Sequence, residues 1–108
     1  MDSDTLTEES TVAAQDILSA LEHHRDELRE LGVKKLGLFG SASRGELRAE
    51  SDLDFVVELQ HKSLDNLLRI KFLLEDTFHR RVDVVLTQSL RPEIRERVLR
   101  ETRYVSGL

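Results

Sequence analysis

The sequence predicts an α/β domain in which a small sheet is covered by helices. Apolar residues recur with helical spacing in three stretches, and short segments between them are typical of strands. With a short helical turn after the first strand, the order is α, β, α, β, α, β, α. The 108 residues are the size of one domain and contain no internal repeat or low-complexity linker. Residues 1–10, rich in Ser, Thr, Asp and Glu, are expected to be flexible, so a single domain is expected over residues 11–108.

The first helix is predicted by apolar residues three, four and seven positions apart: Ile17, Leu18, Leu21, Leu28 and Leu31. Gly32 is a plausible end for it. Residues 34–39 then read as a strand that runs into Gly40, where the chain is expected to turn sharply. Residues 42–50 are expected to form a short helical turn, ending near Gly45, and then a loop.

The second strand is predicted over residues 52–59 by alternation, and its two faces differ in kind. One face is apolar and is expected to pack under helices; it carries Leu53, Phe55, Val57 and Leu59. The other face carries Asp52, Asp54, Val56 and Glu58. This arrangement predicts two carboxylates side by side on one surface of the sheet.

The second half of the chain is predicted to hold a helix, a strand and a final helix. Helical spacing runs to about Phe78 through Leu64, Leu67, Leu68, Phe72, Leu73 and Leu74. Residues 82–86 form the third strand, and Pro92 suits the first turn of the last helix. That helix is expected to continue to about Tyr104, with Ile94, Val98 and Leu99 as its apolar stripe.

Composition excludes several classes of function. The formal net charge of −5 and the pI of about 5.4 argue against broad binding to a nucleic-acid backbone. The absence of cysteine excludes a disulfide scaffold, a thiolate zinc site and a cysteine nucleophile, and it suits a reducing compartment. No apolar run approaches a membrane span, and the acidic N-terminus lacks the features of a secretory signal. We therefore expect a cytoplasmic protein with no membrane contact and no direct nucleic-acid binding.

A candidate phosphate-binding turn follows the first strand. Gly40 and Ser41 lie where a strand meets a short helix, and unpaired backbone N–H groups at such a junction attract anions. Gly40 allows a close approach, and the Ser41 hydroxyl can donate to a phosphate oxygen. Arg44 can contact the phosphates of a bound triphosphate with its forked guanidinium, or it can brace the turn through a salt bridge to Asp52. Taken alone, the Gly-Ser pair is also compatible with an ordinary turn and helix cap.

Candidate metal ligands follow ten residues later. Asp52 and Asp54 lie on one face of a strand, where aspartate is depleted and two carboxylates repel each other. A divalent cation compensates such a pair, and Mg²⁺ usually takes one or two carboxylates together with substrate phosphates. A solvated sheet face is the alternative for the pair alone. Asp83 interrupts an otherwise apolar strand, and if the two strands are neighbours the three carboxylates meet. Such a cluster suits two metal ions that promote the attack of a hydroxyl on a bound triphosphate, and Asp83 would be the carboxylate that activates this hydroxyl.

Taken together, these motifs resemble the nucleotidyltransferase superfamily of polymerase beta type. The resemblance rests on Gly40-Ser41, on Asp52 and Asp54, and on the strand that carries Asp83, and it covers roughly residues 11–105. The chain length and the Arg91-Pro92 start of the last helix are most similar to the minimal nucleotidyltransferases (MNT), the antitoxins paired with HEPN-domain toxins.

The resemblance implies a mixed sheet and a Mg²⁺-dependent transfer of a nucleoside monophosphate with release of pyrophosphate. It implies that Gly40 and Ser41 bind phosphate and that Asp52, Asp54 and Asp83 are the catalytic metal ligands. In that family the transferred nucleoside monophosphate is commonly AMP, which comes from ATP, and the acceptor is a tyrosine of the HEPN toxin. Two alternatives stay open: an antitoxin that masks its partner without catalysis, and a transferase for a small molecule of the aminoglycoside type.

Overall fold

The computed structural model describes residues 14–40, residue 43 and residues 52–108. Four strands form one mixed sheet in the order β3-β2-β1-β4. β1 (Val33–Phe39) runs antiparallel to β2 (Leu53–Leu59) and to the short β4 (Arg103–Tyr104), whereas β2 runs parallel to β3 (Val82–Leu86). The mixed sheet covered by helices confirms the predicted fold class. The expected flexible N-terminus at 1–10 lies outside the described residues, and so does the short turn expected over 42–50, apart from residue 43.

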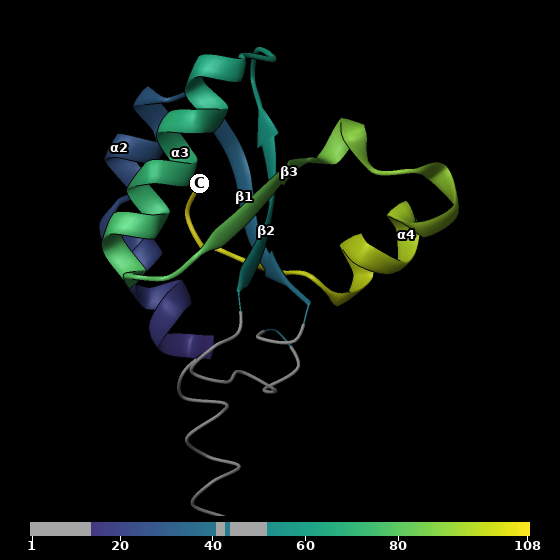
Figure 1. The fold of residues 1–108 in the computed structure, drawn as a ribbon, viewed down its shortest axis with the longest axis horizontal. Coiled ribbons are helices and arrows are strands. Elements are labelled where there is room, and N and C mark those ends of the chain that lie inside the picture. Colours follow the sequence, from purple (N-terminus) through teal and green to yellow (C-terminus); the bar gives the residue numbers. More distant parts are fainter. Residues whose placement is uncertain (1–13, 41–42, 44–51) are drawn as a thin grey trace, which may run out of the picture.

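The helices lie on both sides of the sheet (Figure 1). Residues 14–23 are helical, and α2 (Arg25–Glu30) follows after an interruption at His24. This pair and α3 (Leu64–Phe78) lie on one side of the sheet, and α4 (Pro92–Glu101) lies on the other. Within the described residues, no helix is both long and apolar enough to cross a membrane.

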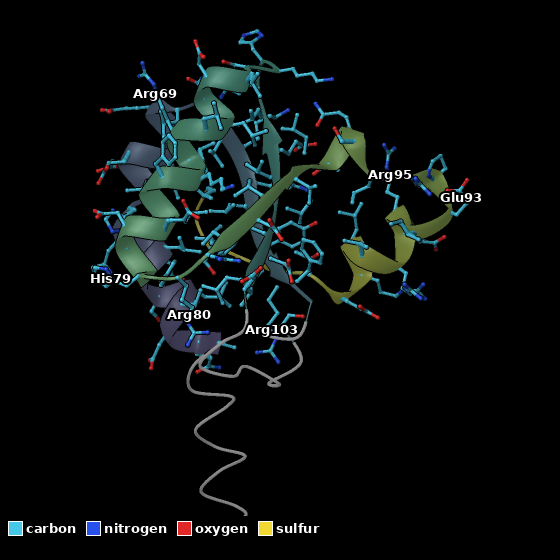
Figure 2. The ribbon with its side chains drawn as sticks, viewed as in Figure 1. Arg69, His79, Arg80, Glu93, Arg95 and Arg103 are labelled. Carbon is cyan, nitrogen blue, oxygen red and sulfur yellow. The ribbon has the colours of Figure 1, made fainter. Side chains whose placement is uncertain are left out.

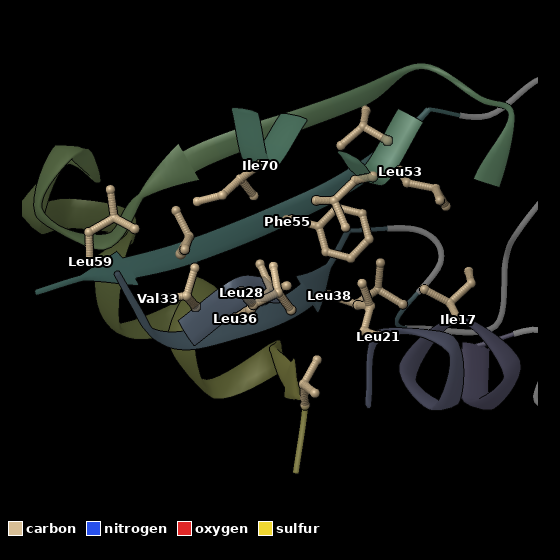
Figure 3. Packing of buried hydrophobic residues seen from close by; sticks show 14 of the residues in the cluster. Ile17, Leu21, Leu28, Val33, Leu36, Leu38, Leu53, Phe55, Leu59 and Ile70 are labelled. Atoms are coloured by element: carbon tan, nitrogen blue, oxygen red, sulfur yellow. The ribbon is translucent and has the colours of Figure 1, made fainter. Parts of the chain in front are cut away.

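The core lies between the sheet and the three helical segments that precede β3 (Figure 3). Alternate residues of β2 point into it, and Phe55 at its centre is fully buried and stacks on Phe78 with ring centroids 6.3 Å apart. The buried members of the core on β2 are the four predicted from alternation: Leu53, Phe55, Val57 and Leu59.

The connection through α3 makes β2 and β3 parallel. Ser63 caps the start of this helix by accepting a hydrogen bond from the backbone N–H of Asn66, and His79 ends it in the left-handed conformation at φ 53°. A helix of 15 residues is about 22 Å long. It therefore returns the chain to the end of the sheet where β2 began, as a parallel connection requires.

The prediction for the last helix was wrong in its length. α4 ends at Glu101 instead of continuing to about Tyr104, and the next residues form β4 against β1. Pairing with Gly37 and Leu38 satisfies backbone groups at the edge of the sheet, which overrides the continuing helical pattern. The pairing depends on Gly37, because a Cβ there would collide with Thr102 Cγ2.

Candidate active site

The sheet brings two of the predicted carboxylates into register. Asp54 of β2 lies opposite Asp83 of the parallel strand β3 and opposite Phe39 of the antiparallel strand β1. Both aspartates point to the face of the sheet away from the main core, as alternation predicts. Asp52 directly precedes β2 and is exposed. The neighbouring strands on which the sequence argument depended are therefore present.

Gly40 lies directly beside the Asp54 carboxylate. It follows the last residue of β1 and has φ 77°, a left-handed conformation that glycine adopts without strain. A Cβ built at Gly40 would lie 2.6 Å from Oδ2 of Asp54. The missing side chain thus allows the turn after β1 to approach the carboxylate.

Ser43 closes this turn and was not singled out from the sequence. Its hydroxyl donates a hydrogen bond of 2.8 Å to the carbonyl oxygen of Gly40, and the residue is only 5% exposed. A serine three residues after a turn glycine is the local signal that could have indicated it. Ser41, Arg44 and Gly45, the other predicted parts of the turn, lie outside the described residues.

The charges of Asp83 and Asp52 lie close enough to affect the ionisation of Asp54. Burial raises the pKa of Asp54 above its ordinary value of 3.8, and the negative charges of Asp83 and Asp52 raise this pKa further. All three causes disfavour the charged form of Asp54. A cation bound here would reverse this effect by compensating the excess negative charge.

The donor set suits a hard cation. Every candidate ligand is a carboxylate oxygen, and Mg²⁺ commonly takes one or two carboxylates and completes its shell with phosphate and water. Asp54 is half-buried, whereas Asp52 and Asp83 are exposed and accessible to a substrate. Over residues 14–40, 43 and 52–108, no three His, Cys, Asp or Glu side chains already converge as a metal-binding group. The carboxylates of Asp54 and Asp83 are therefore chemically suitable ligands for Mg²⁺.

The family model described as Nucleotidyltransferase domain matches residues 21–105 of the chain. The chain belongs to this family. The nucleotidyltransferase is 41% identical over 93 residues to the protein adenylyltransferase MntA of Thermococcus cleftensis, and the match covers 84% of the chain and 94% of the relative.

Solved structures agree with this assignment. The structure of a minimal nucleotidyltransferase matches with a TM-score of 0.67 at 34% identity, covering 90% of this chain and 93% of that one. A complex of a tri-AMPylated Shewanella oneidensis HEPN toxin with MNT antitoxin matches with a TM-score of 0.57 over 92% of this chain and 73% of the matched chain. At 18% identity that second match shows the fold alone. The resemblance to the minimal nucleotidyltransferases of polymerase beta type is confirmed, and the protein is an enzyme of this class.

Proposed function

We propose that this nucleotidyltransferase transfers AMP from ATP to a tyrosine hydroxyl of a HEPN toxin and so acts as its antitoxin in the cytoplasm. The observation that carries the proposal is the position of Asp54, which has the glycine turn on one side and Asp83 on the other. This supports the proposal because a site for a nucleoside triphosphate with Mg²⁺ would combine an anion-binding turn with a carboxylate pair. The similarity to a protein adenylyltransferase supports the choice of AMP. The HEPN toxin and its tyrosine are proposed from the resemblance to the minimal nucleotidyltransferases, and the toxin complex with the same fold is consistent with such a partner.

In the proposed mechanism, the turn at Gly40 and Ser41 binds the triphosphate through backbone N–H groups and the serine hydroxyl. Asp52 and Asp54 would hold Mg²⁺ together with the phosphates, and Asp83 would complete the set of ligands. When bound, Mg²⁺ would lower the pKa of the attacking hydroxyl and neutralise negative charge on the leaving pyrophosphate. Arg44 is proposed to supply a positive charge to the phosphates.

Asp83 is proposed to orient the acceptor. It is exposed at the edge strand of the sheet, so an incoming tyrosine can reach it, whereas Asp54 is half-buried between two strands. As the tyrosine oxygen bonds to the α-phosphorus, the bond from that phosphorus to the pyrophosphate oxygen breaks, and the Asp83 carboxylate accepts the hydroxyl proton. The products are the AMP-tyrosine ester and pyrophosphate.

Intact-mass spectrometry of a HEPN protein encoded beside this chain tests the proposal. After incubation with the nucleotidyltransferase, Mg²⁺ and each nucleoside triphosphate in turn, the toxin is expected to gain one or more AMP units with ATP. Asp52→Ala and Asp54→Ala are expected to abolish the gain. Glu58→Ala is the matched control, because Glu58 is a half-buried carboxylate on the same face of β2 but lies four residues from Asp54. Inhibition of the toxin without any gain in mass would favour masking and contradict the proposal.

Asp83→Ala separates chemistry from binding. We expect this variant to lose transfer while calorimetric titration shows that much of the ATP affinity is kept, because the turn and the other two aspartates remain. Equal loss of binding and transfer would contradict the role given to Asp83.

A further inference from the structure

Three large apolar side chains form an exposed stripe along the outer surface of α3. Leu64 is 71% exposed, Leu68 is 43% exposed and Phe72 is 61% exposed. Residues four apart on a helix lie on one face, so the three side chains follow one another along it. We refer to Leu64, Leu68 and Phe72 as the outer stripe.

The outer stripe is separate from the face of α3 that packs on the sheet. Ile70 and Leu74 on that inner face are fully buried. A helix that packs on one side normally presents polar residues on the other, and apolar residues on both sides indicate that both sides are covered. The part of the chain that the structure describes leaves the outer stripe open to solvent.

We propose that the outer stripe binds the same stripe of a second copy of this chain, with the two α3 helices antiparallel about a two-fold axis near Leu68. In this arrangement Leu64 of each copy faces Phe72 of the other, and Leu68 faces its own counterpart. Each large apolar residue therefore meets another one. Isologous packing of this kind is the commonest form of dimer.

The charges beside the stripe fit a second copy of the chain. Asp65 and Arg69 are both exposed, and they lie on the same flank of the outer stripe. Figure 2 shows Arg69 projecting from the side of α3 that faces away from the sheet. The two-fold axis places the corresponding flanks of the two helices on the same side of the dimer. It therefore brings Asp65 of one copy within reach of Arg69 of the other, and this contact occurs twice per dimer. Opposite charges then meet across the interface.

The dimer is expected to be weak and to leave the active site open. A stable interface buries roughly 800 Å² per partner, more than the outer face of one 15-residue helix supplies, so we expect a dissociation constant on the order of 10–100 μM. The outer stripe lies on the helical side of the sheet, whereas Asp54 and Asp83 lie on the opposite face. Dimerisation and nucleotidyl transfer are therefore separable.

Sedimentation velocity of the full chain, over concentrations spanning the expected constant, tests the proposal. The wild type is expected to shift from monomer to dimer. Leu68→Glu places two like charges at the axis and is expected to raise the dissociation constant at least tenfold, while circular dichroism and transfer activity stay unchanged. Ile94→Glu is the matched control, because it makes the same kind of change at a residue of α4 that is 39% exposed, and it is expected to leave the constant unchanged.

A charge exchange tests the pairing itself. Asp65→Arg and Arg69→Asp are each expected to weaken the dimer several-fold, and the two changes in one chain are expected to restore it. A wild type that stays monomeric throughout the range would overturn the proposal, as would a double variant no better than the single ones. If Leu68→Glu abolishes the complex with the HEPN protein while the free wild type is monomeric, the stripe binds the toxin and the proposal is wrong.

Discussion

Replacing Gly40 by alanine tests whether the turn after β1 must approach Asp54. The matched substitution is Gly32→Ala, because both glycines have a left-handed φ, 77° and 83°, but only Gly40 has a carboxylate beside it. The nearest atom to a Cβ at Gly32 is Nδ2 of Asn66, at an ordinary contact distance of 3.9 Å. The pair of variants thus shares the backbone strain and differs in the contact with the site.

The backbone strain sets the effect on stability. A left-handed conformation costs a residue with a Cβ roughly 1–2 kcal/mol. For a domain of this size each kcal/mol shifts the melting temperature by about 4–8 °C, so both variants are expected to melt about 4–16 °C below the wild type. At Gly40 the added Cβ would also lie 2.6 Å from Oδ2 and 3.3 Å from Cγ of Asp54. The carboxylate must turn away from its position.

The effect on activity is expected to separate the two variants. Displacing a reacting group by about 1 Å can cost roughly a hundredfold in rate, so Gly40→Ala is expected to lose about 10- to 100-fold in AMP transfer. Gly32→Ala is expected to keep nearly the full rate below its melting temperature. Thermal unfolding and time-resolved intact-mass measurements of the toxin provide the two readouts. Wild-type transfer by Gly40→Ala would refute the reasoning, and an equal loss of activity in Gly32→Ala would show that lowered stability alone explains it.

Three further substitutions test the site and its support. Asp54→Asn is expected to raise the melting temperature without metal: burial and neighbouring carboxylates raise the pKa of Asp54 above 3.8, so its ionisation destabilises the fold. The stability of the wild type thus falls as the pH rises from near 3.8 through the folded-state pKa of Asp54. Melting temperatures measured at a series of pH values test this. The higher melting temperature of the variant should disappear at lower pH, where Asp54 of the wild type is protonated. Gly37→Ala is expected to lower the free energy of unfolding by about 1–3 kcal/mol, because the added Cβ collides with Thr102. It should also expose the amides of β4 to hydrogen exchange, and unchanged protection of these amides would contradict this. Phe55→Ala is expected to cost about 3–5 kcal/mol in urea unfolding, because it empties the centre of the core, and a loss below about 1 kcal/mol would contradict this.

Strand β2 shows what local pattern can predict. The alternation of residues 52–59 placed Leu53, Phe55 and Val57 in the core and Asp54 on the opposite face, and the structure agrees. This prediction was possible because the side-chain period of two is a property of the strand itself. The roles of the aspartates and of Gly40, Ser41 and Arg44 stay predictions until they are tested.

Helix α3 shows where local pattern falls short. Its apolar residues predicted a helix correctly, yet Leu64, Leu68 and Phe72 are exposed while Ile70 and Leu74 are buried. Apolar residues lie on both sides of this helix, so periodicity alone cannot say which side meets the sheet. That choice depends on where β2 and β3 lie.

The sequence by itself determined strands β1, β2 and β3, helix α3, the turn glycine and the face of β2 on which Asp54 lies, because each follows from residues near one another in the chain. Only the tertiary structure decided that Asp83 lies in register with Asp54 and that Arg103 and Tyr104 pair with β1. Both are pairings between distant segments, and hydrogen bonding across the whole sheet selects them.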